Sequence, residues 1–220
     1  MSPTWIKVLR AAGSVHIWRR GTVLMREGEP ADRVLLLERG LVKITSESAT
    51  GYTSLLALRG PGELVGELSC VDGGPRSATA TAMGSVAGVA VPVARFEALL
   101  GQQDGLALAV LRMVAWRLRD ADGQRGDFGA RSASVRTALA LARLAGRYGT
   151  PVPGAPAGSP ARRLAVTQQE LAGAAGSSRE SVVRVLRQLG EAGLVVTSRG
   201  MVLVVDPVAL VGWSSGASGT

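Results

Sequence analysis

The chain has 220 residues, 46% of them hydrophobic, so it can build one large domain or two modest domains, each with its own core. Cys70 is the only cysteine and His16 the only histidine, which excludes an internal disulfide and a site held by several thiolates. No persuasive Ser-His-Asp or Cys-His set can be assembled from them, and no Walker-type loop is present. We therefore expect no enzymatic activity, no metal and no iron–sulfur cluster. Cys70 is either a small buried residue, which we favour, or a reactive sensor thiol.

The positive charge lies mainly in the C-terminal part of the sequence. The formal net charge is +8, of which residues 125–220 carry +6 and residues 1–124 carry +2. This excess favours a polyanionic partner. No run of about 18 apolar residues exists, and the N-terminus lacks the apolar segment of a signal peptide. We expect a soluble, cytoplasmic protein without a membrane partner.

Short apolar segments separated by glycine and proline turns run from residue 14 to residue 92, a pattern typical of a β domain. The strands expected are Ser14–Ile17, Val34–Glu38, Leu41–Thr45, Ser54–Leu58, Thr79–Met83 and Val86–Val91. This much fits any small β-barrel or β-roll.

A more specific signal lies at residues 62–78, GELVGELSCVDGGPRSA. Gly66, Glu67 and Leu68 open a short helical turn whose free backbone N–H groups favour an anion, and Gly66 lets a ligand approach the backbone. Arg76 can pair with a phosphate, and Ser77 can donate to it. Glu67 can accept from a ribose hydroxyl. A phosphate and a sugar hydroxyl together indicate a nucleotide.

Two helices are expected after the β domain, over Val93–Leu100 and Asp104–Asp122. The longer helix repeats apolar residues every three to four positions, which is typical of a core-facing helix or of a coiled-coil seam. The stripe consists of Leu108, Leu111, Ala115, Leu118 and either Ala121 or Asp122.

Three glycines, Gly123, Gly126 and Gly129, follow where a long helix would normally continue. Each costs about 1 kcal/mol relative to alanine inside a helix. We expect a frayed or hinged segment there, ordered when a ligand or DNA selects one arrangement.

Residues 167–189, TQQELAGAAGSSRESVVRVLRQL, carry the pattern of a helix-turn-helix. Helices are expected over Gln168–Ala174 and Ser178–Leu189. Gly176 lies at the turn, where a positive φ is least unfavourable for glycine. The small Ala172 lets the two helices cross closely.

The second of these helices is amphipathic, with an apolar face and a charged edge. In the major groove an Arg can donate two hydrogen bonds to guanine, at O6 and N7, and a Glu can accept a hydrogen bond from cytosine N4. The residues expected to read bases are Arg179, Glu180 and Arg184. Those expected to hold phosphates near helix N-termini are Gln168, Gln169, Ser177 and Ser178. A solvated charged face is the alternative interpretation.

Two short apolar segments, Leu194–Ser198 and Met201–Val205, predict a hairpin that forms the wing of a winged helix. Arg199 at its tip is expected to contact a phosphate. An earlier helix is expected to begin after the N-cap Ser132 and to run to about Tyr148.

The two motifs together make the sequence resemble the cyclic-AMP receptor protein and fumarate-nitrate regulator (CRP/FNR) family of bacterial transcription factors, over roughly Val15 to Pro207. The resemblance implies an α+β fold with an N-terminal, jelly-roll-like β-roll that binds a cyclic nucleotide, a long dimerisation helix and a C-terminal winged helix-turn-helix. It also implies a homodimer on a palindromic operator in double-stranded DNA, with RNA polymerase as a further candidate partner. The domains expected are the β-roll over 1–102, the dimerisation helix and hinge over 103–130, the DNA-binding domain over 131–213 and a disordered tail over 214–220.

The resemblance also assigns roles to individual residues. In the family, the positions that match the cassette hold the cyclic nucleotide, and those that match Arg179, Glu180 and Arg184 read the operator half-site. A Thr-Ser pair closes over the base in the cyclic-AMP receptor itself, and here Ala121 and Asp122 stand in its place. Asp122 can accept from an adenine amino group or from guanine N1–H and N2–H₂. The effector is therefore cyclic AMP, which we favour, cyclic GMP, or none. The alternative is a regulator that is ligand-independent or takes a different ligand, with a vestigial nucleotide site.

Overall fold

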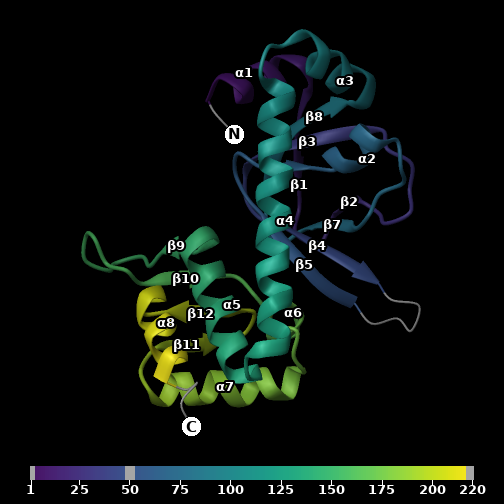
Figure 1. Ribbon diagram of the computed structural model, residues 1–220. Helices are drawn as coiled ribbons and strands as arrows, with labels where there is room; N and C mark the ends of the chain where they lie inside the picture. The colour runs from purple at the N-terminus through teal and green to yellow at the C-terminus, as the bar shows by residue number, and fades with distance from the viewer. Residues whose placement is uncertain (1–2, 48–52, 217–220) are drawn as a thin grey trace. The chain divides into compact units, whose positions relative to one another are not determined.

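The computed structural model describes residues 3–47 and 53–216, and the chain divides into two compact units, Met1–Asp122 and Gly123–Thr220 (Figure 1). The division falls inside the long helix α4 (Leu106–Ala130).

Two four-stranded antiparallel sheets form the frame of the first unit, with strand orders β1-β8-β3-β6 and β2-β7-β4-β5. The strands are β1 (Ser14–Trp18), β2 (Val23–Met25), β3 (Arg33–Arg39), β4 (Val42–Glu47), β5 (Thr53–Arg59), β6 (Leu64–Val65), β7 (Thr79–Ala82) and β8 (Val86–Pro92). The helices are α1 (Pro3–Ala12), α2 (Glu67–Asp72), α3 (Val93–Gln102) and the first part of α4. The β domain expected between residues 14 and 92 is confirmed.

Strand β3 is buried on both faces, because successive side chains point to opposite sides of a strand. Leu35 and Leu37 join a core made by residues of both sheets. Val34 and Leu36 join a second core, which includes Phe96 of α3. The apolar run VLLL thus reflects burial on two sides, and the unit has two cores instead of one.

In this unit the six expected strands are all present, whereas strands β2 and β6 and helix α1 were not predicted. Strands β2 and β6 have three and two residues, too few for a period-two pattern to register. Helix α1 carries Trp5, Ile6 and Leu9 at helical spacing, and these residues pack on the core shared with α3.

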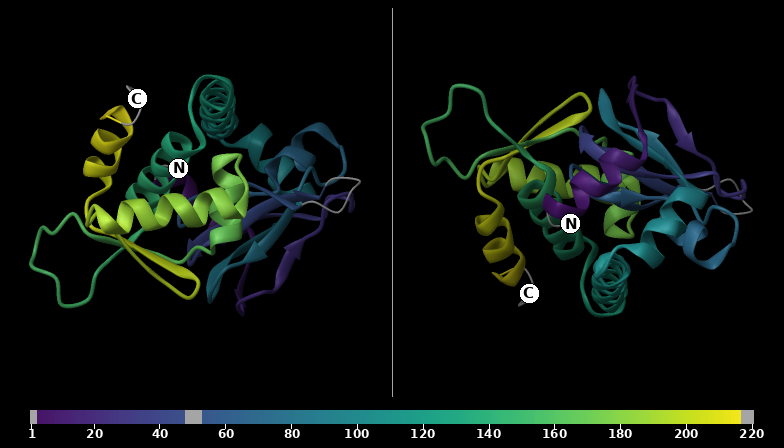
Figure 2. Two further views of the ribbon diagram at one scale, coloured as in Figure 1. Left: turned by 90° about the horizontal axis from the view of Figure 1, so that it is seen from below. Right: turned by 90° about the horizontal axis from the view of Figure 1, so that it is seen from above.

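The second unit combines a small antiparallel sheet, of strand order β11-β12-β10-β9, with four helices. Its strands are β9 (Thr150–Pro151), β10 (Arg162–Leu164), β11 (Val195–Ser198) and β12 (Met201–Val204). Its helices are α5 (Ala133–Tyr148), α6 (Gln168–Ala175), α7 (Arg179–Glu191) and α8 (Pro207–Gly216). The loop that joins β9 to β10 extends away from the rest of the unit (Figures 1 and 2).

The structure corrects the expectation for the glycine-rich segment. Helix α4 continues without a break through Gly123 and Gly126 to Ala130. Isolated glycines weaken a helix by about 1 kcal/mol each, a cost that the helix-forming residues on either side of them can offset. The ligand dependence of this segment stays a prediction.

The expected C-terminal tail also begins too early. Residues 214–216 belong to α8, whose first residue is Pro207 and whose Val208 N–H donates to the Asp206 carboxylate at 2.8 Å. Leu210 is fully buried, and Ser214 is 1% exposed. Packing on α5 therefore keeps this segment helical. Residues 217–220 of the expected tail lie outside the described residues.

No helix in the described part of the chain is both long enough and apolar enough to cross a membrane.

Candidate nucleotide pocket and nucleic-acid interface

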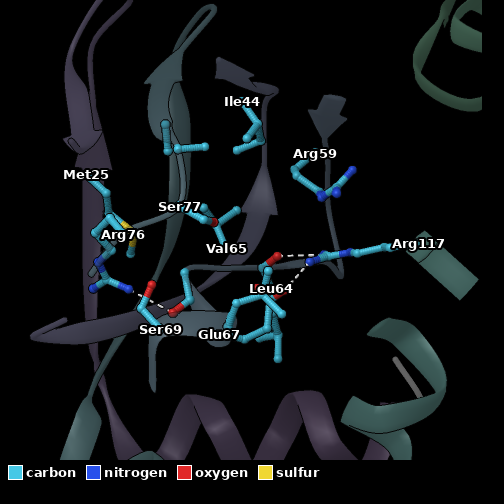
Figure 3. Close-up of a pocket in the computed structure, with 14 residues that line it drawn as sticks. Met25, Ile44, Arg59, Leu64, Val65, Glu67, Ser69, Arg76, Ser77 and Arg117 are labelled. Carbon is cyan, nitrogen blue, oxygen red and sulfur yellow. Dashed lines mark hydrogen bonds and ion pairs between the residues drawn. The ribbon is translucent and has the colours of Figure 1, made fainter. Parts of the chain in front are cut away.

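A pocket opens in the first unit where α2 meets the second sheet and the α4 residue Arg117 (Figure 3). Its polar lining is Arg59, Glu67, Ser69, Arg76, Ser77 and Arg117, and its apolar lining includes Met25, Ile44, Leu64, Val65, Leu68, Ala78 and Ala80. The pocket therefore brings together Gly66, Glu67, Leu68, Arg76 and Ser77, the five cassette residues predicted from the sequence.

Gly66 is required at the start of α2 by its backbone and by its neighbours. Its φ is 81°, in the left-handed region that side chains other than glycine rarely adopt. A Cβ there would lie 2.5 Å from Arg76 Nη1 and 2.5 Å from Met25 Sδ. The backbone at the N-terminus of α2 can therefore come close to Arg76 only because residue 66 has no side chain.

The guanidinium of Arg76 is buried and held by acceptors from three places. Nη1 donates to the Gly66 carbonyl at 2.7 Å, and Nη2 donates to the Arg33 carbonyl at 2.6 Å and to Asp32 Oδ1 at 3.0 Å. The Arg76 side chain is 2% exposed, whereas that of Asp32 is 59% exposed. The positive charge at this end of the pocket is thus fixed in position before any ligand arrives.

Glu67 and Arg117 form a buried ion pair at the other side of the pocket (Figure 3). Arg117 Nη1 donates to Glu67 Oε1 at 2.5 Å, and Nη2 donates to the Leu64 carbonyl at 2.7 Å. The Glu67 side chain is 3% exposed and that of Arg117 is 14% exposed. Arg117 Nε–H is buried without a hydrogen-bond partner. A buried donor without an acceptor lowers the stability of the fold, because its desolvation is not compensated.

Arg117 was not among the residues predicted from the sequence. It lies four residues before Ala121, on the same face of α4 and about 6 Å away along the helix axis. The sequence did contain a signal for Arg117, namely a basic residue one helical turn before the pair expected to close over the base. The pocket lining does not include Ala121 and Asp122, so the structure does not bring them to the cassette.

Cys70 belongs to α2 and is 2% exposed, as expected of a small buried residue. Burial raises the pKa of its thiol above the ordinary value, against the opposing influence of Arg76. The thiol is therefore protonated at neutral pH and poorly nucleophilic. Among the residues that the structure describes, no His, Cys, Asp or Glu cluster is arranged to hold a metal ion.

The helix-turn-helix consists of α6 and α7 and has the packing that the sequence predicts. Thr167 and Glu170 form a reciprocal capping box at the start of α6, and Gly176 ends it with φ 55°. Ala172 and Val182 are fully buried, as close crossing of the two helices requires.

Arg136 of α5 holds the end of α6 in place. Its Nε donates to the Ala175 carbonyl at 2.9 Å and its Nη2 to the Gly176 carbonyl at 2.9 Å. Its Nη1 donates to the Arg131 carbonyl at 2.7 Å. One guanidinium thus satisfies carbonyls at the turn between α6 and α7, and it was not anticipated from the sequence.

The outer face of α7 is exposed and charged. Ser178 caps the helix by accepting from the Ser181 N–H at 3.1 Å. Hydrogen bonds from its own backbone N–H and from Ser178 lower the pKa of Glu180, so the carboxylate stays ionised as an acceptor. Arg184 Nη2 lies 3.4 Å from Ser181 Oγ.

A groove in the second unit runs between the helix-turn-helix and the β11–β12 hairpin. It brings together four of the predicted DNA contacts, which are Gln168, Gln169, Arg179 and Arg199. Ser177, Ser178, Glu180 and Arg184 lie outside its lining, at the turn and along α7. The groove thus has basic residues at α7 and at the tip of the wing, and positive charge of this kind favours a phosphate backbone.

A nucleotide-type pocket in a β-roll, joined in one chain to a winged helix-turn-helix, defines the class of DNA-binding transcriptional regulators with a ligand-binding domain. Residues 15–103 match the cyclic nucleotide-binding domain, and residues 135–213 match the Crp-like helix-turn-helix domain. The chain belongs to the CRP/FNR family of transcriptional regulators, which are not enzymes.

Two relatives agree with this assignment, and a solved structure shares the fold. The chain is 32% identical over 189 residues to the CRP-like cAMP-activated global transcriptional regulator of Mycobacterium tuberculosis, covering 85% of this chain and 82% of that one. It is 31% identical to the cyclic AMP receptor protein of Thermus thermophilus, covering 89% and 85%. A CRP/FNR-family regulator from Thermus thermophilus, TTHA1359, has the same fold, with a TM-score of 0.75 at 23% identity over 92% of this chain and 98% of that one.

Proposed function

We propose that the protein is a cytoplasmic, homodimeric regulator whose affinity for a palindromic operator is controlled by a cyclic nucleotide in the β-roll. The observation that carries the proposal is the buried Arg117 Nε–H, an unsatisfied donor beside Glu67 and across the pocket from Arg76. A ligand with acceptor oxygens would satisfy that donor. Relatives named as cAMP-activated make cyclic AMP the first nucleotide to test.

The cassette offers distinct partners to the parts of such a ligand. The backbone at Gly66, the Ser77 hydroxyl and the charge of Arg76 suit the cyclic phosphate. Glu67 has two oxygens, and a carboxylate can accept about four hydrogen bonds, so a ribose hydroxyl can donate to it while Arg117 remains bonded. The ligand would therefore join the ion pair without displacing it.

One observation favours the second candidate function, a ligand-independent regulator. Arg76 already donates to two carbonyls and to Asp32, so its charge is satisfied without a phosphate. In that case the cassette would stabilise the β-roll and nothing more. The two candidates differ in whether any nucleotide changes the affinity for DNA.

The base of the ligand would be selected by residues outside the present pocket lining, which does not include Ala121 and Asp122. If ligand binding brings these two residues to the base, the Ala121 side chain offers no hydrogen bond and the Asp122 carboxylate offers only acceptors. Cyclic AMP presents one amino group to such an acceptor, and cyclic GMP presents N1–H and N2–H₂. Both nucleotides therefore belong in the first experiment.

The dimer would form through α4. Leu108, Leu111 and Leu118 are 47%, 62% and 58% exposed on this helix, and their spacings of three and seven residues match the heptad of a coiled-coil seam. Two copies of α7 would then meet successive major grooves about 34 Å apart. RNA polymerase is the further partner that activation would require.

DNA recognition would use both edges of the groove in the second unit. Arg179, Glu180 and Arg184 on the outer face of α7 would read base edges, and Arg199 at the wing would contact the backbone. Gln168, Gln169, Ser177 and Ser178 lie near helix N-termini, where phosphates bind.

Calorimetric titration of the nucleotide-stripped protein with cyclic AMP and then cyclic GMP tests the proposal. Micromolar binding of either nucleotide, with a matching change in operator affinity, would support the sensor. No heat and no effect on DNA binding with either nucleotide would favour the ligand-independent regulator.

A further inference from the structure

Val183 is an apolar residue in the middle of the charged face of α7. At 100° per residue it lies about 40° from Arg179 and about 60° from Glu180 around the helix, with Arg184 and Arg187 on the same arc. Its side chain is 43% exposed. The face proposed to enter the major groove thus has a hydrophobic centre and charged sides.

The packing of α7 does not require a valine at this position. The core-facing residues of the helix are Val182, Val185, Leu186 and Leu189, which are at most 3% exposed. Val183 falls outside that apolar arc and leaves much of its surface in solvent. A polar residue there would serve an isolated helix equally well, so the valine is better explained by what covers this face.

The base edges of the major groove present one apolar group, the C5-methyl of thymine. Arginine matches guanine and glutamate matches cytosine, whereas an alkyl side chain matches only that methyl. We infer that Val183 contacts the C5-methyl of a thymine in each half-site and makes that base pair part of the recognised sequence. The inference rests on the proposal that α7 reads DNA.

Position and stiffness both favour such a contact. Val183 is the fifth residue of α7, within the N-terminal part of a recognition helix that reaches base edges. A β-branched side chain in a helix has one strongly preferred rotamer, so little rotamer freedom is lost when it is covered. The contact adds sequence preference without a hydrogen bond or a charge.

The test starts from a library of random duplex DNA, so that the operator sequence need not be known in advance. The full-length protein, without nucleotide, with cyclic AMP and with cyclic GMP, enriches its half-site, and each thymine of the enriched site is then replaced by deoxyuridine. One thymine should show a loss of about fourfold in affinity when its methyl is removed, the value for burial of about one methyl group. The same loss should be absent in Val183→Ser, which lacks both valine methyls.

Two variants control this measurement. Val183→Thr keeps one methyl and should retain part of the discrimination between thymine and deoxyuridine. Val208→Ser makes the same chemical change on α8, at a valine that is 77% exposed, and should discriminate as the wild type does. Urea unfolding of each variant establishes that the fold is unchanged.

The outcomes separate this inference from the proposed function. If no sequence is enriched without nucleotide, with cyclic AMP or with cyclic GMP, the recognition role of α7 fails and the inference falls with it. If a half-site is enriched but no thymine methyl contributes, or its contribution survives in Val183→Ser, only the role of Val183 is overturned.

Discussion

Arg117 contacts Glu67 across 50 residues of sequence, donating from Nη1 at 2.5 Å while its Nε–H stays buried without an acceptor. This pair links the start of α2 to α4, the helix that continues to the boundary of the first unit. A ligand that satisfies the donor would stabilise this arrangement of α2 and α4.

We expect Glu67→Gln to weaken cyclic-nucleotide binding about tenfold and to lower the free energy of unfolding by about 2 kcal/mol, because Arg117 loses its charged acceptor. Calorimetry and urea unfolding measure the two effects. Glu97→Gln, at an exposed carboxylate of α3, is the matched control and should change neither. An unchanged nucleotide affinity in Glu67→Gln would remove Glu67 from the site.

Arg76→Ala should abolish the nucleotide response. The affinity for DNA without nucleotide should stay within about twofold of the wild-type value, because Arg76 belongs to the first unit and the helix-turn-helix to the second. The change also leaves the Gly66 and Arg33 carbonyls without their donor, at a cost of about 1–3 kcal/mol each. Arg76→Lys keeps the charge and serves as a second variant if the alanine protein unfolds. Nucleotide affinity equal to that of the wild type in both variants would refute the phosphate role.

Gly66→Ala and Gly73→Ala form a matched pair, because both glycines have positive φ values, 81° and 70°. Only Gly66 is crowded, by Arg76 Nη1 and Met25 Sδ, whereas nothing lies within 4 Å of a Cβ at Gly73. Gly73→Ala should cost about 1 kcal/mol of backbone strain, and Gly66→Ala should cost clearly more. Equal losses of stability in urea unfolding would mean that the crowding is relieved by small movements.

Arg179→Ala and Arg199→Ala should separate base reading from backbone contact. We expect Arg179→Ala to lose about 1–3 kcal/mol at the specific site and to relax its sequence preference. Arg199→Ala should weaken all sequences alike and reduce the salt slope by about one. Binding isotherms at several salt concentrations on specific and random DNA measure both. The base-reading role fails if Arg179→Ala behaves like Arg199→Ala.

Replacing Gly123 and Gly126 by alanine should strengthen the C-terminal part of α4 by about 1 kcal/mol per site. If this segment orders on ligand binding, hydrogen exchange over residues 122–130 should slow on nucleotide addition in the wild type and already be slow in the double variant. Exchange that is equally slow in the wild type with and without nucleotide would contradict a hinge.

Local patterns predicted many of the elements well. The Ser132 cap, whose side chain accepts from the Val135 N–H, follows from residue chemistry within one turn, as does the turn at Gly176. Both depend on interactions between residues a few positions apart, which sequence displays directly. The glycine-rich end of α4 was predicted less well, because helix propensity is a weak prior against the length of a 25-residue helix.

The sequence by itself determined the two motifs, since the residue types and their spacing identify the cassette and the recognition helix without the tertiary structure. Only the tertiary structure placed Arg117 on Glu67, Asp32 on Arg76 and Arg136 on the turn after α6. Each of these contacts joins residues 39 to 50 positions apart, or brings a guanidinium to a backbone carbonyl that no side-chain pattern marks. Long-range partners of buried charges are decided by how the elements pack, which periodicity along one segment does not encode.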